Sequence, residues 1–205
     1  MIWLELSVGT FVVLFIHEIG HLLIARLLSI RVLGISIGLG PTLFAFEDRW
    51  KTRWNLCVLP LRGNVAVWDD DAAAGRRTHS DALSDKTLNQ QAAFYLAGPA
   101  FSLLLGLLLV EVVIFWPNDP ILQLRNANDG LTIGLLLGDL SIVIGLFNLL
   151  PLPPLDGGKL LLLWIQTRRP LSDRAQTLLS RVGMMLINIV TVGLVVAGVW
   201  LSFNI

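Results

Sequence analysis

Two histidines and a glutamate stand close together near the amino-terminal end, in the order His17-Glu18-Ile19-Gly20-His21. Histidines four residues apart lie on one face of a helix, at a spacing that lets both imidazoles hold one zinc ion. A glutamate between them is placed to take a proton from a zinc-activated water. The surrounding run from Leu6 to Leu28 is apolar and long enough to cross a bilayer. Because ionisable groups are costly there, the pattern predicts metal-assisted hydrolysis inside a membrane.

A second group with metal-binding chemistry follows the third apolar run, in the stretch Asn148-Leu149-Leu150-Pro151-Leu152-Pro153-Pro154-Leu155-Asp156-Gly157-Gly158. The prolines end the helix and force an extended path, which could bring Asp156 back toward the histidines. Catalytic zinc usually takes three protein ligands and a water, so Asp156 is the candidate third ligand. The alternative interpretation of Asp156 is a turn residue ahead of two glycines.

The composition predicts an all-α polytopic membrane protein. Hydrophobic residues make up 55% of the 205 residues and charged residues 15%, below the roughly 25% of soluble domains. Four segments, at about 4–29, 92–116, 131–150 and 183–203, approach the roughly 20 apolar residues that a bilayer requires. The formal net charge of zero gives no reason to expect a nucleic-acid partner, and the single Cys57 excludes an internal disulfide.

Cationic residues concentrate between residues 31 and 91 and between residues 159 and 182. By the positive-inside rule both loops are predicted to be cytoplasmic, with both termini outside. Short β-like runs broken by Gly34, Gly38 and Gly40 predict a small membrane-associated β-sheet at about 31–68. The polar stretch at about 69–91 is predicted to be a cytoplasmic loop. All of these parts are expected to form one membrane-embedded domain, 1–205.

Taken together, these stretches resemble the site-2 protease family of intramembrane zinc metalloproteases. The family's H-E-x-x-H is matched at His17–His21, and its N-x-x-P-x-P-x-L-D-G at Asn148–Gly157. Two shorter likenesses lie between them, at Gly38-Leu39-Gly40 and at Ala97-Gly98-Pro99. The matches occur in the family's order and cover about Phe11 to Lys159.

The resemblance implies one zinc ion per chain, held by His17, His21 and Asp156. It implies that Glu18 acts as general base and then as proton donor, and that Asn148 helps to hold the substrate carbonyl or the oxyanion. The implied substrates are transmembrane segments of membrane-anchored regulatory proteins, usually pre-cut by another protease, in regulated intramembrane proteolysis. The implied location is a bacterial inner membrane, with the active site toward the cytoplasm.

The chain also departs from the family pattern. Ser102 stands where the family has an asparagine, and Asn64 interrupts its glycine-rich stretch. Both positions are expected to contact substrate or gate its entry. These departures leave open a catalytically inactive homologue that binds transmembrane segments, and a membrane zinc carrier is a further alternative that would have no need of Glu18. The chain is expected to be a compact form that lacks PDZ and CBS domains.

Overall fold

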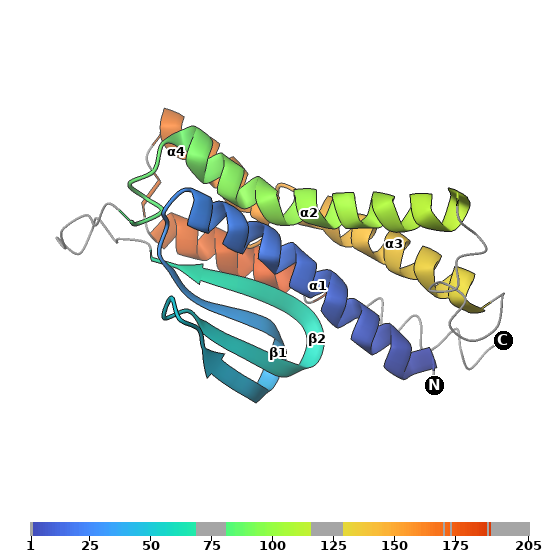
Figure 1. Cartoon of the computed structure of the whole chain (residues 1–205). Helices are drawn as coiled ribbons and strands as arrows, with labels where there is room; N and C mark the ends of the chain where they lie inside the picture. The colour runs from blue at the N-terminus through green and yellow to red at the C-terminus, as the bar shows by residue number, and fades with distance from the viewer. Residues whose placement is uncertain are drawn as a thin grey trace. The chain divides into compact units, whose positions relative to one another are not determined.

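The computed structural model describes residues 2–68, 81–115, 129–169, 171–172, 174–187 and 189, and the chain divides into two compact units, Met1–Asn148 and Leu149–Ile205. The first unit contains helix α1 (Ile2–Leu27), strands β1 (Val32–Glu47) and β2 (Arg53–Val67), and helices α2 (Leu88–Phe115) and α3 (Asp129–Asn148) (Figure 1). The second contains helix α4 (Asp156–Arg168). The predicted helical fold with a small sheet after the first helix is confirmed.

Helix α1 ends in a turn that is set by its own backbone hydrogen bonds. The amide of Ile30 donates to the carbonyl of Ala25 at 2.7 Å, and the amide of Ser29 donates to the carbonyl of Arg26 at 3.1 Å. Ser29 has a φ of 53°, the left-handed conformation in which helices commonly end. The turn therefore directs the chain straight from α1 into β1.

Strands β1 and β2 form a two-stranded antiparallel sheet with an irregular register. Residues Ile35, Ser36 and Ile37 each have two partners, one in Trp54–Leu56 and another in Gly63–Val65. This double pairing makes the first half of β1 the interior of the sheet. Ile35 and Ile37 are accordingly almost fully buried, whereas the second half of β1 is exposed.

Helix α2 begins at Leu88, four residues before the predicted apolar span, inside the segment predicted to be loop. The backbone and hydroxyl of Thr87 donate to the side-chain oxygen of Gln90, and the amide of Gln90 faces the Thr87 hydroxyl at 3.4 Å. This reciprocal capping arrangement satisfies amides that the first helical turn would otherwise leave without partners. The polar cap therefore extends the helix beyond its apolar part.

The three helices of the first unit approach one another at glycines. A Cβ built on Gly20 of α1 would lie 2.6 Å from the carbonyl oxygen of Ala97 in α2. A Cβ on Gly106 of α2 would lie 2.7 Å from the carbonyl oxygen of Gly138 in α3. Small residues at such crossings let helix backbones pack closely, as they do in membrane proteins. These contacts fix which face of α2 lies against α1.

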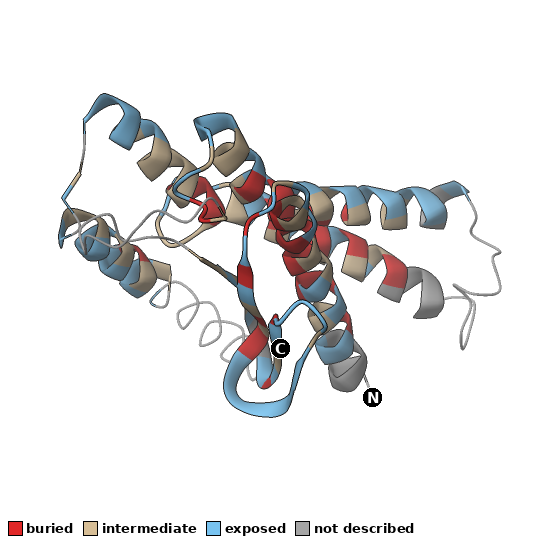
Figure 2. Cartoon of the chain, turned by 60° about the vertical axis from the view of Figure 1, so that its left-hand side comes forward, coloured by how far each residue is buried: buried red, intermediate tan, exposed pale blue. Residues whose placement is uncertain are grey.

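Buried side chains concentrate where α1 meets the sheet and the start of α2 (Figure 2). In contrast, α2 and α3 expose large apolar side chains, including Leu104, Leu107 and Val143. Among the described residues, Ser7–Leu27 and Leu88–Val112 are long and apolar enough to cross a membrane, and Gly134–Asn148 is apolar but shorter. The predicted count of four spans is not confirmed, and most of the predicted span 183–203 lies outside the described residues.

In the second unit, the proline-rich segment leads into α4 through close backbone contacts. The amide of Leu155 donates to the carbonyl of Leu152 at 2.9 Å. A Cβ on Gly157 would lie 2.6 Å from the carbonyl oxygen of Leu150. A Cβ on Gly158 would collide with the backbone of Leu152 and Pro153. The two glycines after Asp156 are therefore required by the approach of the preceding backbone, and this packing sets where Asp156 begins the helix.

Candidate metal centre

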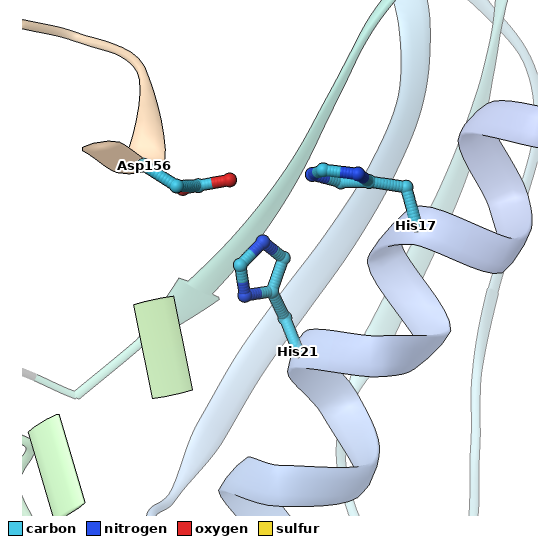
Figure 3. A group of neighbouring side chains, drawn as sticks. All are labelled: His17, His21 and Asp156. Carbon is cyan, nitrogen blue, oxygen red and sulfur yellow. The ribbon is translucent and has the colours of Figure 1, made fainter. Parts of the chain in front are cut away.

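Helix α1 presents His17, Glu18 and His21 in its second half, and all three side chains are buried, with 4–5% exposure. Figure 3 shows both imidazoles projecting from successive turns of α1 on the same side of the helix. The ring centroids are 5.1 Å apart and the ring planes are nearly perpendicular. The helical spacing therefore produces the paired arrangement that the sequence predicts.

The imidazole of His21 is oriented by helix α2. Its Nδ1 lies 2.8 Å from the carbonyl oxygen of Phe94, and both groups are buried. Because a carbonyl oxygen only accepts hydrogen bonds, Nδ1 must carry the proton and donate it. The neutral ring then has its lone pair on Nε2, the form in which a histidine binds a metal through that nitrogen.

The imidazole of His17 has a different partner on the same helix. Its Nδ1 lies 2.9 Å from the hydroxyl oxygen of Ser102, which is fully buried. Ser102 is in turn linked to α3, since the hydroxyl of Ser141 donates to the Ser102 carbonyl at 2.8 Å. The structure places Ser102 against a predicted metal ligand, and the expectation that Ser102 contacts substrate or gates its entry stays a prediction.

The Nε2 atoms of both histidines face Gly98 of α2. A Cβ built on Gly98 would lie 2.6 Å from Nε2 of His17 and would also collide with Nε2 of His21. Glycine is therefore the residue at this position that leaves room beside the two nitrogens. Zinc–nitrogen bonds of about 2.0–2.1 Å need such room, so the arrangement of the histidines fits a metal ligand pair.

Glu18 lies against strand β2 of the sheet. A Cβ built on Gly63 of β2 would lie 2.6 Å from both Cγ and Cδ of Glu18 and would collide with Oε1. A cavity of about 240 Å³ opens beside the same strand, lined by Ser36, Gly38, Leu39, Arg62, Gly63 and Asn64. The absence of a side chain at Gly63 thus lets the β2 backbone reach the carboxylate beside an open cavity.

Asp156 is the first residue of α4, in the second unit, and it is buried, with 6% exposure of the residue. The ammonium group of Lys159, one turn later, donates to Oδ1 of Asp156 at 3.3 Å. A carboxylate that is held through one oxygen can still offer the other to a metal, and such outer partners orient metal ligands. Asp156 therefore has the chemistry of a ligand.

Asn148 is the last residue of α3, and its amide nitrogen donates to the carbonyl of Ile144 at 2.9 Å. This bond lies within its own helix and does not test a role with substrate. The catalytic part assigned to Asn148 stays a prediction.

The family resemblance points to Gly98 and Ser102, but the sequence predicts neither their contacts with the histidines nor the part of Phe94. Phe94, Gly98 and Ser102 follow one another at intervals of four residues, so they share one face of the helix. That periodicity is a signal that could have drawn attention to the stripe. The Phe94 contribution is a backbone carbonyl, which no residue type reveals.

The chain is similar to known proteins. Residues 5–133 and 126–190 match the family described as Peptidase family M50. A relative from Mesorhizobium japonicum is 38% identical over 114 residues, which is 50% of this chain and 31% of the relative. A Rhizobium meliloti relative is 36% identical over 126 residues (54% and 34%), and one from Agrobacterium fabrum 33% over 146 residues (63% and 39%).

The names of these three relatives assign them provisionally as zinc metalloproteases. The matched segments span about a third of each relative's length.

Proposed function

Because the chain belongs to peptidase family M50, the site-2 protease family, we propose that it is an intramembrane zinc endopeptidase that cleaves transmembrane segments of membrane-anchored regulatory proteins. One observation carries the proposal. Two oriented imidazoles turn their Nε2 atoms to the bare backbone of Gly98, and the buried Glu18 beside them lies against Gly63, which lines an open cavity. The order of these residues in the sequence is that of H-E-x-x-H metalloproteases.

The proposed zinc ligands are His17, His21 and Asp156, the three side chains drawn in Figure 3. Two imidazoles and a carboxylate are a ligand set that could hold a metal, and they leave a fourth position for water or substrate. When bound, the zinc ion would supply Lewis acidity for the scissile carbonyl and acidify a water. Phe94 and Ser102 would keep the imidazoles in the orientation that binding requires.

Glu18 is the proposed general base. Its carboxylate would take a proton from the attacking water and pass it to the leaving amide nitrogen. The low exposure of Glu18 keeps bulk water away from this proton. The cavity lined by Gly63, the glycine that lies against Glu18, is the proposed entrance for the water that is consumed. Asn148 is proposed to help hold the substrate carbonyl or the oxyanion.

A helical substrate hides its carbonyls in hydrogen bonds and must unwind before attack. An unwound segment can pair with the edge of a sheet by adding a strand. Residues 35–37 of β1 already have partners on both sides, so they offer no such edge. We place the docking edge at Gly63–Ala66 of β2, because Gly63 brings this strand to Glu18.

The family is membrane-associated, and two described helices have the length and apolarity to span. We propose a multi-pass protein of a bacterial inner membrane, with the site open to the cytoplasm and both termini outside. Charge distribution supports this orientation, since the cations gather between residues 31 and 91 and between residues 159 and 182. The proposed substrates would first be cut by another protease, as in regulated intramembrane proteolysis.

The experiment measures zinc content and cleavage in the same detergent-purified samples. The variants are Glu18→Gln, His17→Ala and Asp156→Ala, with Asp139→Ala as a control that removes an exposed aspartate of α3. A single-span membrane protein with a helix-breaking residue in its span serves as substrate. We expect about one zinc per chain in wild type, Glu18→Gln and Asp139→Ala, and loss of zinc in the other two. Only wild type and Asp139→Ala should cleave.

Two results would contradict the proposal. Full cleavage by Glu18→Gln would remove the general base from the mechanism. A folded wild-type chain without stoichiometric zinc would instead favour the inactive homologue that binds transmembrane segments.

A further inference from the structure

A second cavity, whose lining includes two arginines, lies at the end of α1, away from the histidines. It has a volume of about 310 Å³, within the range of small-molecule sites, and is lined by Arg26, Ser29, Ile30, Arg31, Val32, Trp50 and Thr52. Two arginines, a serine and a threonine are among these residues, and guanidinium and hydroxyl groups recognise phosphate oxygens. The cavity therefore has the chemistry of an anion site.

One wall of this cavity is rigidly built around Asp48. Its carboxylate accepts hydrogen bonds from Arg26 at 2.9 Å, from the indole of Trp54 at 3.1 Å and from the amides of Trp50 and Thr52. The guanidinium of Arg26 also lies 4.0 Å from the ring centre of Trp50. Arg26 is thus held in place and its charge is balanced before any ligand arrives.

The cavity is also lined by Arg31. Arg31 is anchored by its backbone, whose amide donates to the carbonyl of Asp81 at 2.9 Å, and its guanidinium lies 5.4 Å from the ring centre of Trp68. No ion pair joins Arg31 to an acid within the described part of the chain. Five cations stand against two carboxylates between residues 26 and 53, namely Arg26, Arg31, Arg49, Lys51 and Arg53 against Glu47 and Asp48. The region therefore attracts anions.

The position of the cavity identifies its occupant. It opens at the carboxyl end of Ser7–Leu27, the helical segment with the properties of a span, where Leu27 is 77% and Trp50 54% exposed. Exposed tryptophans beside arginines mark the level of lipid headgroups, and anionic lipids of the cytoplasmic leaflet are drawn to basic residues there. A second guanidinium, from Arg49, stacks on Trp50 at 3.9 Å.

We propose that this cavity binds the phosphate of an anionic phospholipid, with Arg31 as its principal cation and Trp50 at the acyl-chain boundary. The site rests on the membrane placement in the proposed function but on neither zinc nor proteolysis. Bound lipid would fix the end of α1, and with it the depth at which His17 and His21 lie in the bilayer.

The test titrates the full chain in a neutral detergent with dihexanoyl phosphatidylglycerol and counts bound lipids by native mass spectrometry. Dihexanoyl phosphatidylcholine, inorganic phosphate and hexaglutamate are titrated in parallel. We expect the anionic lipid alone to bind well. Arg31→Gln should weaken binding of the anionic lipid at least about tenfold, because a charge-assisted hydrogen bond is lost. Arg53→Gln, which removes the same charge outside the cavity, should change it less than about twofold.

Equal weakening by Arg31→Gln and Arg53→Gln would reduce the effect to diffuse charge and overturn the site. Binding of phosphatidylcholine as strong as that of phosphatidylglycerol would also overturn the proposal. Equally strong binding of inorganic phosphate would assign the cavity to a free anion, and equally strong binding of hexaglutamate would assign it to an acidic protein segment. The wild-type selectivity decides the matter even where Arg31→Gln does not fold. The zinc content of the same samples shows whether the metal centre is lost independently of lipid binding.

Discussion

Gly98→Ala is the most direct perturbation of the candidate metal centre, because it adds one methyl group and removes no ligand. That methyl would stand 2.6 Å from Nε2 of His17 and 2.7 Å from Cδ2 of His21. Carbon and nitrogen atoms in ordinary contact are separated by about 3.5 Å or more, so both rings must move by roughly an ångström. Both rings are tied through Nδ1, to Ser102 and to the Phe94 carbonyl, and cannot move without breaking a buried hydrogen bond.

The size of the effect follows from this geometry. Overpacking a well-packed site costs about 1–3 kcal/mol of folding free energy, so the variant should still fold. Disturbing an outer partner of a metal ligand typically costs 10–100-fold in affinity. Here the two proposed ligand nitrogens are displaced together, and we expect zinc affinity to fall at least about 100-fold, roughly 2.8 kcal/mol at about 1.4 kcal/mol per factor of ten.

The assay is competition for zinc with a chromophoric chelator in detergent, with thermal unfolding measured in parallel. Gly106→Ala is the matched control on the same helix. Its Cβ would lie 2.5 Å from Cγ1 of Ile142 and 2.7 Å from the carbonyl oxygen of Gly138, but it touches neither histidine. We expect Gly106→Ala to lower the unfolding temperature and to leave zinc affinity within about twofold of wild type. Wild-type zinc affinity in a folded Gly98→Ala would refute the assignment of Nε2 as the binding atom.

Three further predictions concern the neighbouring groups. Ser102→Ala should weaken zinc binding about 10–100-fold, because the contact with His17 is lost. The control is Ser141→Ala, which removes another buried serine hydroxyl and should lower stability without changing zinc affinity. Equal zinc affinities of the two variants would contradict this prediction. Gly63→Ala should keep zinc but lose most cleavage, because its methyl would displace the Glu18 carboxylate, and unchanged cleavage rates would argue against that contact. Burial acts to raise the pKa of Asp48, but hydrogen bonds from Thr52, Trp54 and Trp50 and the charge of Arg26 outweigh it and lower that pKa below its ordinary 3.8. The stability that the Asp48 carboxylate contributes is therefore present above pH 3.8 and is lost as the pH falls through the lowered pKa. The difference in unfolding temperature between wild type and Asp48→Asn should accordingly be constant near neutral pH and shrink in acid.

The elements themselves could be predicted largely from local sequence. Apolar runs with few charges predicted α1 and α2, and the prolines after Asn148 predicted where α3 ends. The apolar run places the start of α2 at residue 92, four residues late, because the Thr87–Gln90 capping pair that begins the helix is polar. The register of the sheet could not be predicted, since the double pairing of residues 35–37 depends on how two long strands curve.

The sequence by itself determined the chemistry of the candidate site. His17, Glu18 and His21 share a helical segment, and the relative position of residues four apart is fixed by the helix alone. The carboxylate of Asp156 is likewise given by the sequence, and the need for glycines after it follows from short-range backbone geometry.

Tertiary structure alone decided which groups surround those side chains. The partners of His17 and His21 lie 85 and 73 residues away, on a face of α2 that small residues bring against α1. Glu18 meets β2 through Gly63, and the end of α1 gains its Trp50 wall from the turn between the strands. No local pattern encodes these contacts, because they depend on which helix faces and strand edges pack together, a choice made by the burial of the whole unit.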